Sequence, residues 1–270
     1  MGKNEIIVPF LKWAGGKRWL VSTYPEILTF SYNRYIEPFL GSGAIYFNLA
    51  PHRAILADQN EELIETYQAI KDDWNLVRKE LKKHHTNHSK RYYYAIRQSK
   101  PRTKHTRAAR FIYLNRTCWN GLYRVNLKGQ FNVPLGTKTS VILNSDNFEA
   151  ISKLLKSADL QVCDFESTIA EAGNRDLLFI DPPYTVKHNL NGFIKYNEKL
   201  FSWEDQIRLR NSVNKAIQRG ALVVLTNAYH NSVKELYKNI GIHRRLKRQS
   251  VLAADCNKRK ICDELLVVVE

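Results

Sequence analysis

Short runs of apolar and β-branched residues recur along the chain, and each closes on a polar or glycine-containing turn. We predict strands at 35–37, 54–57, 160–163, 177–180, 221–226 and 264–270. Helix-like segments follow these runs, and we predict helices at 43–50, 60–70, 147–157, 203–219 and 230–239. Strands that alternate with helices are typical of a parallel, doubly wound α/β sheet.

The alternation stops for about a hundred residues between the second and third predicted strands, far longer than an ordinary connection. Residues 71–116 are predicted to be helical. Residues 122–134 form two extended arms around "NLKG", which indicates a β-hairpin. We therefore expect an inserted domain at 61–144 within a domain formed by 1–60 and 145–270.

The predicted insertion is strongly basic and contains aromatic residues. Its cations are Lys82, Lys83, Lys90, Arg91, Arg97, Lys100, Arg102, Lys104, Arg107 and Arg110, with Tyr92, Tyr93 and Tyr94 among them. The whole chain has 42 Lys and Arg against 26 Asp and Glu, a formal net charge of +16. A solvated helix face would explain one charged run alone. Together these features favour a polyanionic partner, with nucleic acid ahead of an anionic membrane surface.

The longest apolar runs are too short to span a bilayer, and the start of the chain carries no signal-like apolar core. We therefore expect a soluble, cytoplasmic protein with no membrane partner. The cysteines have neither CxxC spacing nor a nearby histidine in a ligand pattern. We expect reduced thiols and no metal site at Cys118, Cys163, Cys256 and Cys262.

Acidic residues close several of the predicted strands, namely Asp58, Asp164 and Asp181. In an open parallel sheet, ligands bind outside the carboxyl ends of the strands, where the strand order reverses. Asp58 stands where a ribose-binding acid is expected, although it can also cap the following helix. Asp164 and Phe165 offer an acceptor and an aromatic face to an adenine ring. These features predict a nucleoside-type site.

Gly41 and Gly43 form a turn that leads into a helix, where the backbone can approach a ligand closely. The turn lacks a GxGxxG pattern, which indicates a ligand without a pyrophosphate. A second turn, "DPPY", follows the fourth predicted strand. Pro182 and Pro183 cannot donate to a strand ladder, so they end the strand and stiffen the backbone directly behind Asp181.

These motifs occur in the order "FLKWAGGK", "EPFLGSG", "ILADQN" and, after the long basic insertion, "DPPY". With "LNRTCWNGLYRVNLKGQFNVP" and the closing "DELLVVV", the chain resembles the Dam-type, alpha-class (D12) DNA adenine-N6 methyltransferases over essentially its whole length. The resemblance implies a methyltransferase sheet and an inserted DNA target-recognition domain. It also implies methyl transfer from S-adenosylmethionine to the N6 amine of a flipped adenine in duplex DNA, within GATC or a related short site.

The resemblance also implies roles for individual residues. The methyl donor is expected to contact Trp13, Lys17, Phe39, Gly41, Gly43, Asp58, Asp164, Phe165 and Asp181. The catalytic residues are expected to be Asp181, Pro182, Pro183 and Tyr184. DNA is expected to contact Lys12, Trp119, Asn120, Leu122, Arg124 and Pro134. Without the motif, Trp13 would be interpreted as a core aromatic residue and Lys17 as a surface charge.

The exocyclic amine of adenine is a poor nucleophile because its lone pair is delocalised into the ring. We expect the Asp181 carboxylate and the Pro182 carbonyl to accept its two hydrogens, with Asp181 acting either as a base or only as an acceptor. The base must leave the duplex stack, and Tyr184 is expected to stack on the extruded ring. Methyl transfer from a sulfonium needs no metal.

The predicted hairpin would enter the major groove of DNA. Arg124 is expected to bind a guanine through two hydrogen bonds, while Leu122 or Pro134 meets a thymine methyl. Trp119 and Asn120 would fill the gap that the flipped base leaves. Lys12 and the basic helices would contact the recognition site and the phosphates.

The chain departs from the family pattern at two places. "TKTS" follows "NVPLG" where Dam-type enzymes commonly place an arginine and an aromatic residue, and Trp119 replaces a tyrosine or phenylalanine. GATC specificity is therefore open. Two alternatives are also open: a DNA cytosine-N4 methyltransferase, and a catalytically idle DNA-binding regulator of the same fold. We expect a monomer or weak dimer, and a cognate restriction endonuclease is a candidate partner.

Overall fold

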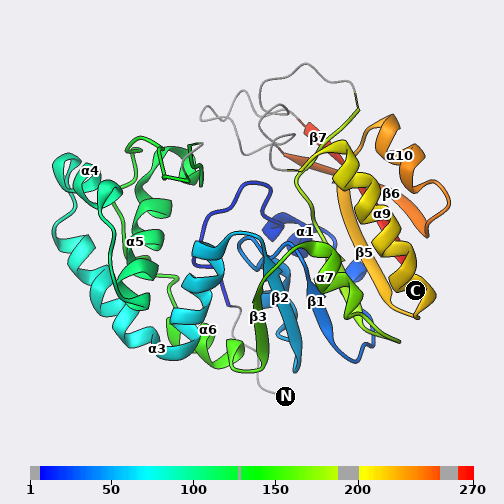
Figure 1. Cartoon of the computed structure of the whole chain (residues 1–270), viewed down its shortest axis with the longest axis horizontal. Helices are drawn as coiled ribbons and strands as arrows, with labels where there is room; N and C mark the ends of the chain where they lie inside the picture. Colours follow the sequence, from blue (N-terminus) through cyan, green and yellow to red (C-terminus); the bar gives the residue numbers. More distant parts are fainter. Residues whose placement is uncertain (1–6, 127–128, 188–200, 250–260) are drawn as a thin grey trace. The chain divides into compact units, whose positions relative to one another are not determined.

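The computed structural model describes residues 7–126, 129–187, 201–249 and 261–270 (Figure 1). The chain forms two compact units. The first unit comprises Met1–Arg18, Gly41–Ala50 and Asn60–Val162. The second unit comprises Trp19–Leu40, Pro51–Gln59 and Cys163–Glu270. Seven strands and the helices between them make the protein a mixed α/β fold, as predicted.

The second unit is built on a twisted array of strands. These are β1 (Tyr35–Glu37), β2 (Ala54–Asp58), β4 (Leu177–Ile180), β5 (Leu222–Ala228), β6 (Ile242–Gln249) and β7 (Ile261–Val269). Their order is β2-β1-β4-β5-β7-β6. The pairs β2–β1, β1–β4 and β4–β5 are parallel, whereas β7 runs antiparallel to both β5 and β6. The chain passes from β1 to β2 on one side and returns to β4 on the other, so the strand order reverses at β1.

Helices cover this sheet and bury its apolar residues. They are α1 (Arg18–Thr23), the 3-10 turn η1 (Pro25–Leu28), α7 (Phe165–Ala170), α9 (Trp203–Gln218) and α10 (Asn231–Tyr237). Helix α9 packs against α7, α10 and β5, and Figure 1 shows it lying along β5. Leu209 and Val213 of α9 pack with Leu178, Val223 and Leu225 of the sheet in one core cluster.

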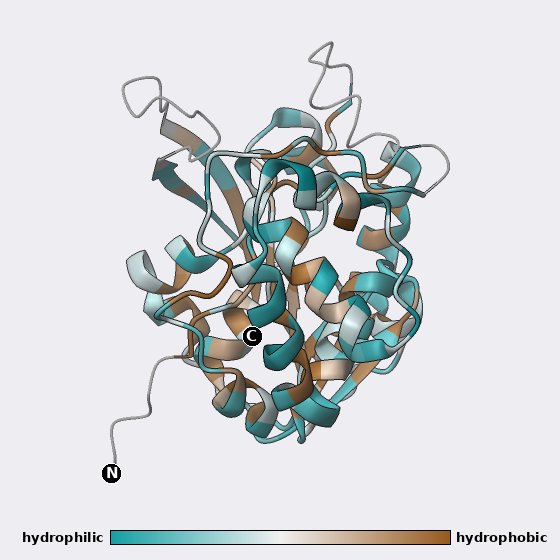
Figure 2. Cartoon of the chain, turned by 90° about the vertical axis from the view of Figure 1, so that its left-hand side faces the viewer, coloured by the Kyte–Doolittle hydropathy of each residue, from teal (hydrophilic) through white to brown (hydrophobic). Residues whose placement is uncertain are grey.

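The first unit is mainly helical. It contains α2 (Ala44–Leu49), α3 (Glu61–Thr86), α4 (Lys90–Gln98), α5 (Lys104–Thr117), η2 (Trp119–Gly121), α6 (Phe148–Leu155) and strand β3 (Ala158–Val162). Helix α3 bends at Asp73, whose backbone is extended and whose carboxylate accepts hydrogen bonds from the next turn. Single helices alternate between hydrophobic and hydrophilic residues, as Figure 2 shows, which is expected of helices that bury one face.

A buried arginine holds three segments of the first unit together. Arg116 of α5 is 2% exposed. It donates to the carbonyls of Phe10 and Val141 at 2.9 and 2.7 Å, and it forms two 2.6 Å hydrogen bonds with Asp146. The N-terminal segment that carries "KWAGGK" is therefore fixed to α5 by hydrogen bonds as well as by packing.

The predicted hairpin is present as a narrow pair of arms. Val125 and Phe131 form an isolated antiparallel bridge. Backbone hydrogen bonds join Asn126 to Gln130 at 2.9 Å and Asn132 to Arg124 at 3.2 Å. Leu127 and Lys128, at the tip of the predicted hairpin, lie outside the described residues.

All six predicted strands and four of the five predicted helices occur within a few residues of their expected bounds, whereas the helix predicted at 60–70 continues to Thr86 as α3. Some elements were missed. Strand β6 reads "IHRRLKRQ", a charged sequence without an apolar run, because it lies at the edge of the sheet and Leu246 is its only buried residue among those described. The six-residue helices α1 and α7 were also missed. The two units divide the chain differently from the 61–144 insertion, so the division into catalytic and target-recognition domains stays a prediction.

Two smaller expectations can be placed on the structure. Among the residues that it describes, no helix is both long enough and apolar enough to cross a membrane. Cys118, Cys163 and Cys262 are free thiols, and Cys256 lies outside the described residues. Burial raises the pKa of the Cys118 thiol to about 12, so this side chain stays protonated at neutral pH.

The burial of His84 predicts that acid destabilises the protein. Its ring stacks on Tyr113 with centroids 4.9 Å apart, and burial lowers its pKa from 6.5 to about 4. The unfolded chain takes up a proton near pH 6.5 that the folded protein accepts only near pH 4, so the free energy of unfolding falls as the pH drops through this window. We expect urea unfolding to show that His84→Gln loses less stability than the wild type across it.

The exposed His52 provides the control for this measurement. His52→Gln is expected to lose stability on acidification as the wild type does. Equal losses in His84→Gln and the wild type would contradict the prediction.

Candidate active site

The carboxyl ends of three adjacent parallel strands form one edge of the sheet in the second unit. Asp58 ends β2, Glu37 ends β1 and Asp181 directly follows β4. Because β1 lies between β2 and β4, Asp58 and Asp181 flank it, about 10 Å apart at the usual spacing of strands. The chain leaves β1 through Pro38 and Phe39 at this reversal of strand order. The structure thus places two of the predicted acids where an α/β sheet binds ligands.

Asp181 is oriented by a neighbouring strand. The hydroxyl of Thr226 on β5 donates to Oδ1 of Asp181 at 2.8 Å, and Thr226 is fully buried. Pro182 is buried behind it and Pro183 is half-buried. The carboxylate therefore starts from a backbone that the prolines stiffen and is held by a hydrogen bond from the sheet.

Tyr184 is hydrogen-bonded to a buried carboxylate. Its hydroxyl donates to Oε2 of Glu264 at 2.7 Å, and Glu264 of β7 is 1% exposed. Nε of Arg248 lies 2.5 Å from the other carboxylate oxygen. Burial, then the charges of Asp181 and Glu264, raise the pKa of Tyr184 well above its usual value. Tyr184 is consequently a neutral phenol. The hydrogen bond from its hydroxyl to Glu264 limits the orientation of the ring.

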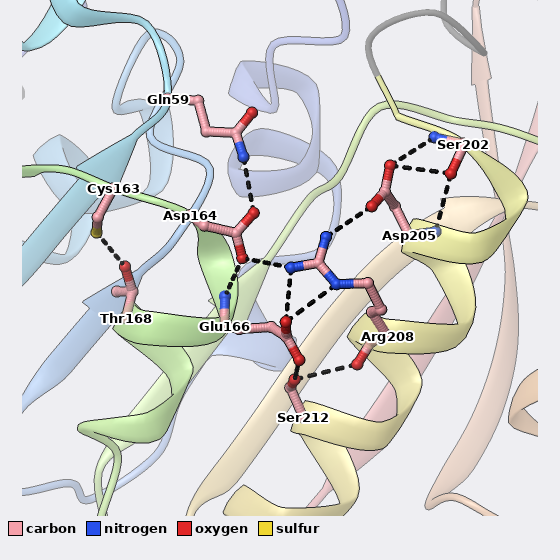
Figure 3. Close-up of polar contacts among 9 residues, drawn as sticks. All are labelled: Gln59, Cys163, Asp164, Glu166, Thr168, Ser202, Asp205, Arg208 and Ser212. Carbon is pink, nitrogen blue, oxygen red and sulfur yellow. Dashed lines mark hydrogen bonds and ion pairs between the residues drawn. The ribbon is translucent and has the colours of Figure 1, made fainter.

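Asp164 and Phe165 begin helix α7. Asp164 is its N-cap, with Oδ1 accepting from the backbone N–H of Glu166 at 2.9 Å, and Figure 3 shows the polar contacts around it. The ring of Phe165 is 1% exposed and lies beneath Phe39, with centroids 5.5 Å apart and planes 24° apart. Phe39 is the half-buried member of this pair. The face of Phe165 that was predicted to meet an adenine ring is therefore buried, and Phe39 is the more exposed ring of the pair.

The remaining residues predicted to contact a methyl donor lie in the first unit. Trp13 stacks on Tyr123 and on Phe111, with ring centroids 5.7 and 6.4 Å apart. A Cβ on Gly41 would lie 2.7 Å from Cδ1 of Trp13, so the indole packs directly on the glycine turn. Lys17 is 3% exposed, and its ammonium donates to the carbonyl of Gly15 at 2.9 Å. Lys17 is therefore not a surface charge, whereas the contacts of Trp13 are also those of a half-buried, packed aromatic residue.

The turn itself has a left-handed backbone. Gly41 and Gly43 have φ of +48° and +64°. Gly43 is also the residue that precedes α2. The hydroxyl of Tyr67 donates to the carbonyl of Gly41 at 3.0 Å and anchors the turn to α3.

The predicted DNA-contacting residues around Lys12 form one surface in the first unit. Asn115 of α5 accepts from the backbone N–H of Lys12 at 2.9 Å and donates to its carbonyl at 2.8 Å. The side chain of Lys12 covers Gly121, whose Cβ would lie 2.7 Å from Lys12 Cδ. Trp119 donates its backbone N–H to the carbonyl of Pro134 at 2.9 Å. Lys12, Trp119 and Pro134 are therefore brought together by the backbone.

The side chains of this surface project outward. Trp119 is 47% exposed, and Asn120 is exposed with a left-handed φ of +56°. A non-glycine residue in this conformation carries strain and is common at functional sites. Burial, and then the charge of Lys138, lower the pKa of Lys12. These observations describe an exposed aromatic residue beside a cluster of cations.

Arg124 is exposed on the hairpin, whereas some cations of the basic helices are bound to neighbouring segments. Arg124 is exposed, and its Nε donates to Asn132 across the hairpin at 2.9 Å. Arg107 of α5 forms an ion pair with Glu65, and Arg110 donates to the carbonyls of residues 96 and 97 at 3.0 and 2.7 Å. At least these two cations of the predicted basic face hold the helices together.

Arg208 of α9 also reaches this geometry, because its Nη2 donates to Oδ1 of Asp164 at 3.0 Å. Four residues with a place in this geometry were missed from the sequence: Thr226, Glu264, Asn115 and Arg208. Thr226 and Glu264 lie inside predicted apolar strands, and a buried polar residue in such a strand is a usable signal because it needs a partner. Asn115 and Arg208 lie within helices and give no such signal. The predicted donor site is divided between the two units, and a single pocket that unites its halves stays a prediction.

Comparison with known proteins gives a consistent result. A family model described as D12 class N6 adenine-specific DNA methyltransferase matches residues 13–251. The Type II methyltransferase M1.LlaDCHI of Lactococcus lactis subsp. cremoris is 38% identical over 252 residues, covering 90% of this chain and 89% of that protein. The Type II methyltransferase M.MjaIII of Methanocaldococcus jannaschii is 33% identical, covering 97% and 99%. The DNA adenine methylase of Escherichia coli K12 is 30% identical, covering 99% and 96%.

The contact between Gly41 and Trp13 can be tested by adding one methyl group. In Gly41→Ala the new Cβ meets an indole that is stacked on two other rings and cannot easily move. We expect calorimetry to show S-adenosylmethionine binding weakened about tenfold or more, since the left-handed backbone is strained as well.

Gly129→Ala is the matched control for this substitution. Gly129 has φ of +71°, and the described residues leave open space around its Cβ. It should carry the same backbone strain and keep wild-type donor affinity. Wild-type affinity in Gly41→Ala would contradict the importance of this contact.

Proposed function

Because the chain belongs to the D12 class N6 adenine-specific DNA methyltransferases, we propose that it transfers a methyl group from S-adenosylmethionine to the N6 amine of a flipped adenine in duplex DNA. The target is a short site, GATC or one related to it. The observation that carries the proposal is the "DPPY" turn at the carboxyl edge of β4, with Asp181 and Tyr184 each held by a partner from the sheet.

The residues present fit the methyl donor. Asp58 and Asp181 offer carboxylates on either side of the strand-order reversal, which suits a ribose hydroxyl and a cationic amino acid group. The left-handed glycine turn allows close backbone approach, and Trp13 closes it. We assign donor binding to Trp13, Lys17, Phe39, Gly41, Gly43, Asp58, Asp164, Phe165 and Asp181. When bound, S-adenosylmethionine supplies a methyl group activated by its sulfonium.

The chain's own groups act on the amine. We assign the Asp181 carboxylate and the Pro182 carbonyl as acceptors for its two hydrogens, which draws the nitrogen lone pair out of the ring. The Thr226 hydroxyl fixes Oδ1 of Asp181, so the carboxylate needs little reorganisation during transfer. Pro183 limits the movement of the turn.

Tyr184 supplies the stacking surface for the flipped base. Its hydroxyl is committed to Glu264, and its raised pKa keeps the ring neutral. An aromatic ring fixed in this way offers its face to an extruded purine and lowers the cost of unstacking it.

The surface that contains Lys12, Trp119 and Pro134 is the proposed DNA contact. An exposed tryptophan beside a strained asparagine suits the gap left by a flipped nucleotide. Lys12 supplies a cation for the recognition site, and Leu122 or Pro134 can meet a thymine methyl. Arg124, on the exposed hairpin, is proposed to read a guanine.

One experiment tests the reaction and its alternatives. The protein is incubated with methyl-labelled S-adenosylmethionine and duplex DNA, the DNA is digested to nucleosides, and the labelled base is identified. We expect label in N6-methyl-2′-deoxyadenosine. Label in N4-methyl-2′-deoxycytidine would replace the proposed base, and tight DNA binding without label would favour an inactive regulator. Sequencing of the modified DNA then gives the target site.

Asp181→Ala is expected to abolish methyl transfer and leave DNA binding largely intact, because it removes one amine acceptor while the proposed DNA surface is unchanged. Labelled turnover and an electrophoretic shift assay measure the two properties. Asp159→Ala, at an exposed aspartate, is the control and should keep both. Wild-type turnover in Asp181→Ala would contradict the assignment.

Arg124→Ala is expected to relax specificity at one guanine, at a cost of about 1–3 kcal/mol for that base pair. Competition assays with single-base variants of the site measure this. The same loss at every sequence would instead identify a phosphate contact. Arg102→Ala removes an exposed cation of the basic segment and should leave the base preferences unchanged.

A further inference from the structure

Arg208 on helix α9 lies at the centre of a cluster of carboxylates in the second unit (Figure 3). Its Nη2 lies 3.0 Å from Oδ1 of Asp164 and 2.6 Å from Oε2 of Glu166. Its Nη1 donates to Asp205 at 2.7 Å. Hydrogen bonds from Arg208 lower the pKa of Glu166 and raise that of Arg208. One guanidinium therefore holds carboxylates from both α7 and α9.

These contacts fix the direction of the Asp164 carboxylate. Oδ1 accepts from Arg208 and from the backbone N–H of Glu166, and Oδ2 accepts from the Gln59 amide at 2.8 Å. A carboxylate has about four lone-pair sites. Within the described part of the chain, these donors occupy three of them. Asp164 can therefore accept one further hydrogen bond from a fixed direction.

Arg208 also reaches the aromatic neighbour of Asp164. Its guanidinium carbon lies over the ring of Phe165, 4.9 Å from the centroid. Phe165 in turn supports the half-buried Phe39. The same side chain thus contacts both Asp164 and Phe165, the pair that the sequence predicts to contact an adenine ring.

A purely structural role explains this arrangement poorly. The side chains of Arg208, Asp164, Glu166 and Asp205 are 43, 32, 43 and 27% exposed. Ion pairs this exposed typically contribute little to stability. The core between α7 and α9 is instead supplied by buried apolar residues such as Ile169 and Leu209. Loss of Arg208 should leave the fold intact but let the neighbouring carboxylates repel one another.

We propose that Arg208 is a positioning residue that makes the donor site selective for an adenine ring by holding Asp164 as a hydrogen-bond acceptor. The proposal rests on the proposed function. An adenine presents an exocyclic N–H₂ donor to the carboxylate. A hypoxanthine ring presents a carbonyl oxygen at the same position, and two facing acceptors repel. Discrimination therefore requires a charged and immobile Asp164.

The test measures binding of S-adenosylhomocysteine and S-inosylhomocysteine by calorimetry, without any methyl transfer. We expect the wild type to prefer the adenosyl compound. In Arg208→Met the ratio of the two dissociation constants should fall about tenfold or more, the size expected for a hydrogen bond to a charged group. Arg208→Lys should recover part of the preference because it retains the cation.

Arg219→Met is the matched control. Arg219 also joins α9 to α7, donating to the carbonyls of Ala172 and Ile169 at 2.7 and 2.8 Å, but these contacts lie away from Asp164. It should keep the wild-type ratio. Equal weakening of both ligands in Arg208→Met would overturn the positioning role. Binding of neither ligand by the wild type would instead overturn the proposed function on which it rests.

Discussion

Strand β1 pairs with β2 on one side and with β4 on the other. The arrangement of the candidate active site at the carboxyl ends of these strands depends on this pairing. β1 has three residues, all buried, and its register with both neighbours is fixed by parallel ladders. The ladders place Glu37 opposite Leu56 and Ile36 opposite Leu178, so Asp58 and Asp181 extend beyond the end of β1 on its two sides although they are distant in sequence. Any slip of β1 would move Glu37 relative to both acids.

Buried and half-buried charges then set directions at this edge and elsewhere. Arg116 fixes the N-terminal segment to α5, and Glu264 fixes Tyr184 through its hydroxyl. Buried ion pairs add little stability compared with well-packed apolar side chains, because both charges lose their hydration. Their contribution in this protein is geometric: each limits a functional segment to one orientation.

Sequence patterns were sufficient for six of the seven strands in the described residues and for the positions of Asp58 and Asp181 at strand ends. The runs before Asp58 and Asp181 are apolar because both faces of those strands are covered, and this produces a clear signal. Strand β6 gave none, since an edge strand exposes most of its side chains and can be charged throughout. Partners such as Asn115 and Arg208 were also beyond prediction, because an amide or guanidinium on a helix acquires its role only when a distant segment packs against it.

The brevity of β1 has a consequence for how the protein fluctuates. A three-residue strand between two neighbours cannot detach alone, since its amides and carbonyls pair on both sides. Opening this edge requires cooperative disruption of the sheet, so slow amide exchange should extend to its end. The hairpin is held by fewer backbone contacts than β1. Its arms are joined by the isolated bridge between Val125 and Phe131 and by a few hydrogen bonds. The end of β1 therefore shares the stability of the sheet, whereas the hairpin depends on one bridge, a few hydrogen bonds and the burial of Phe131.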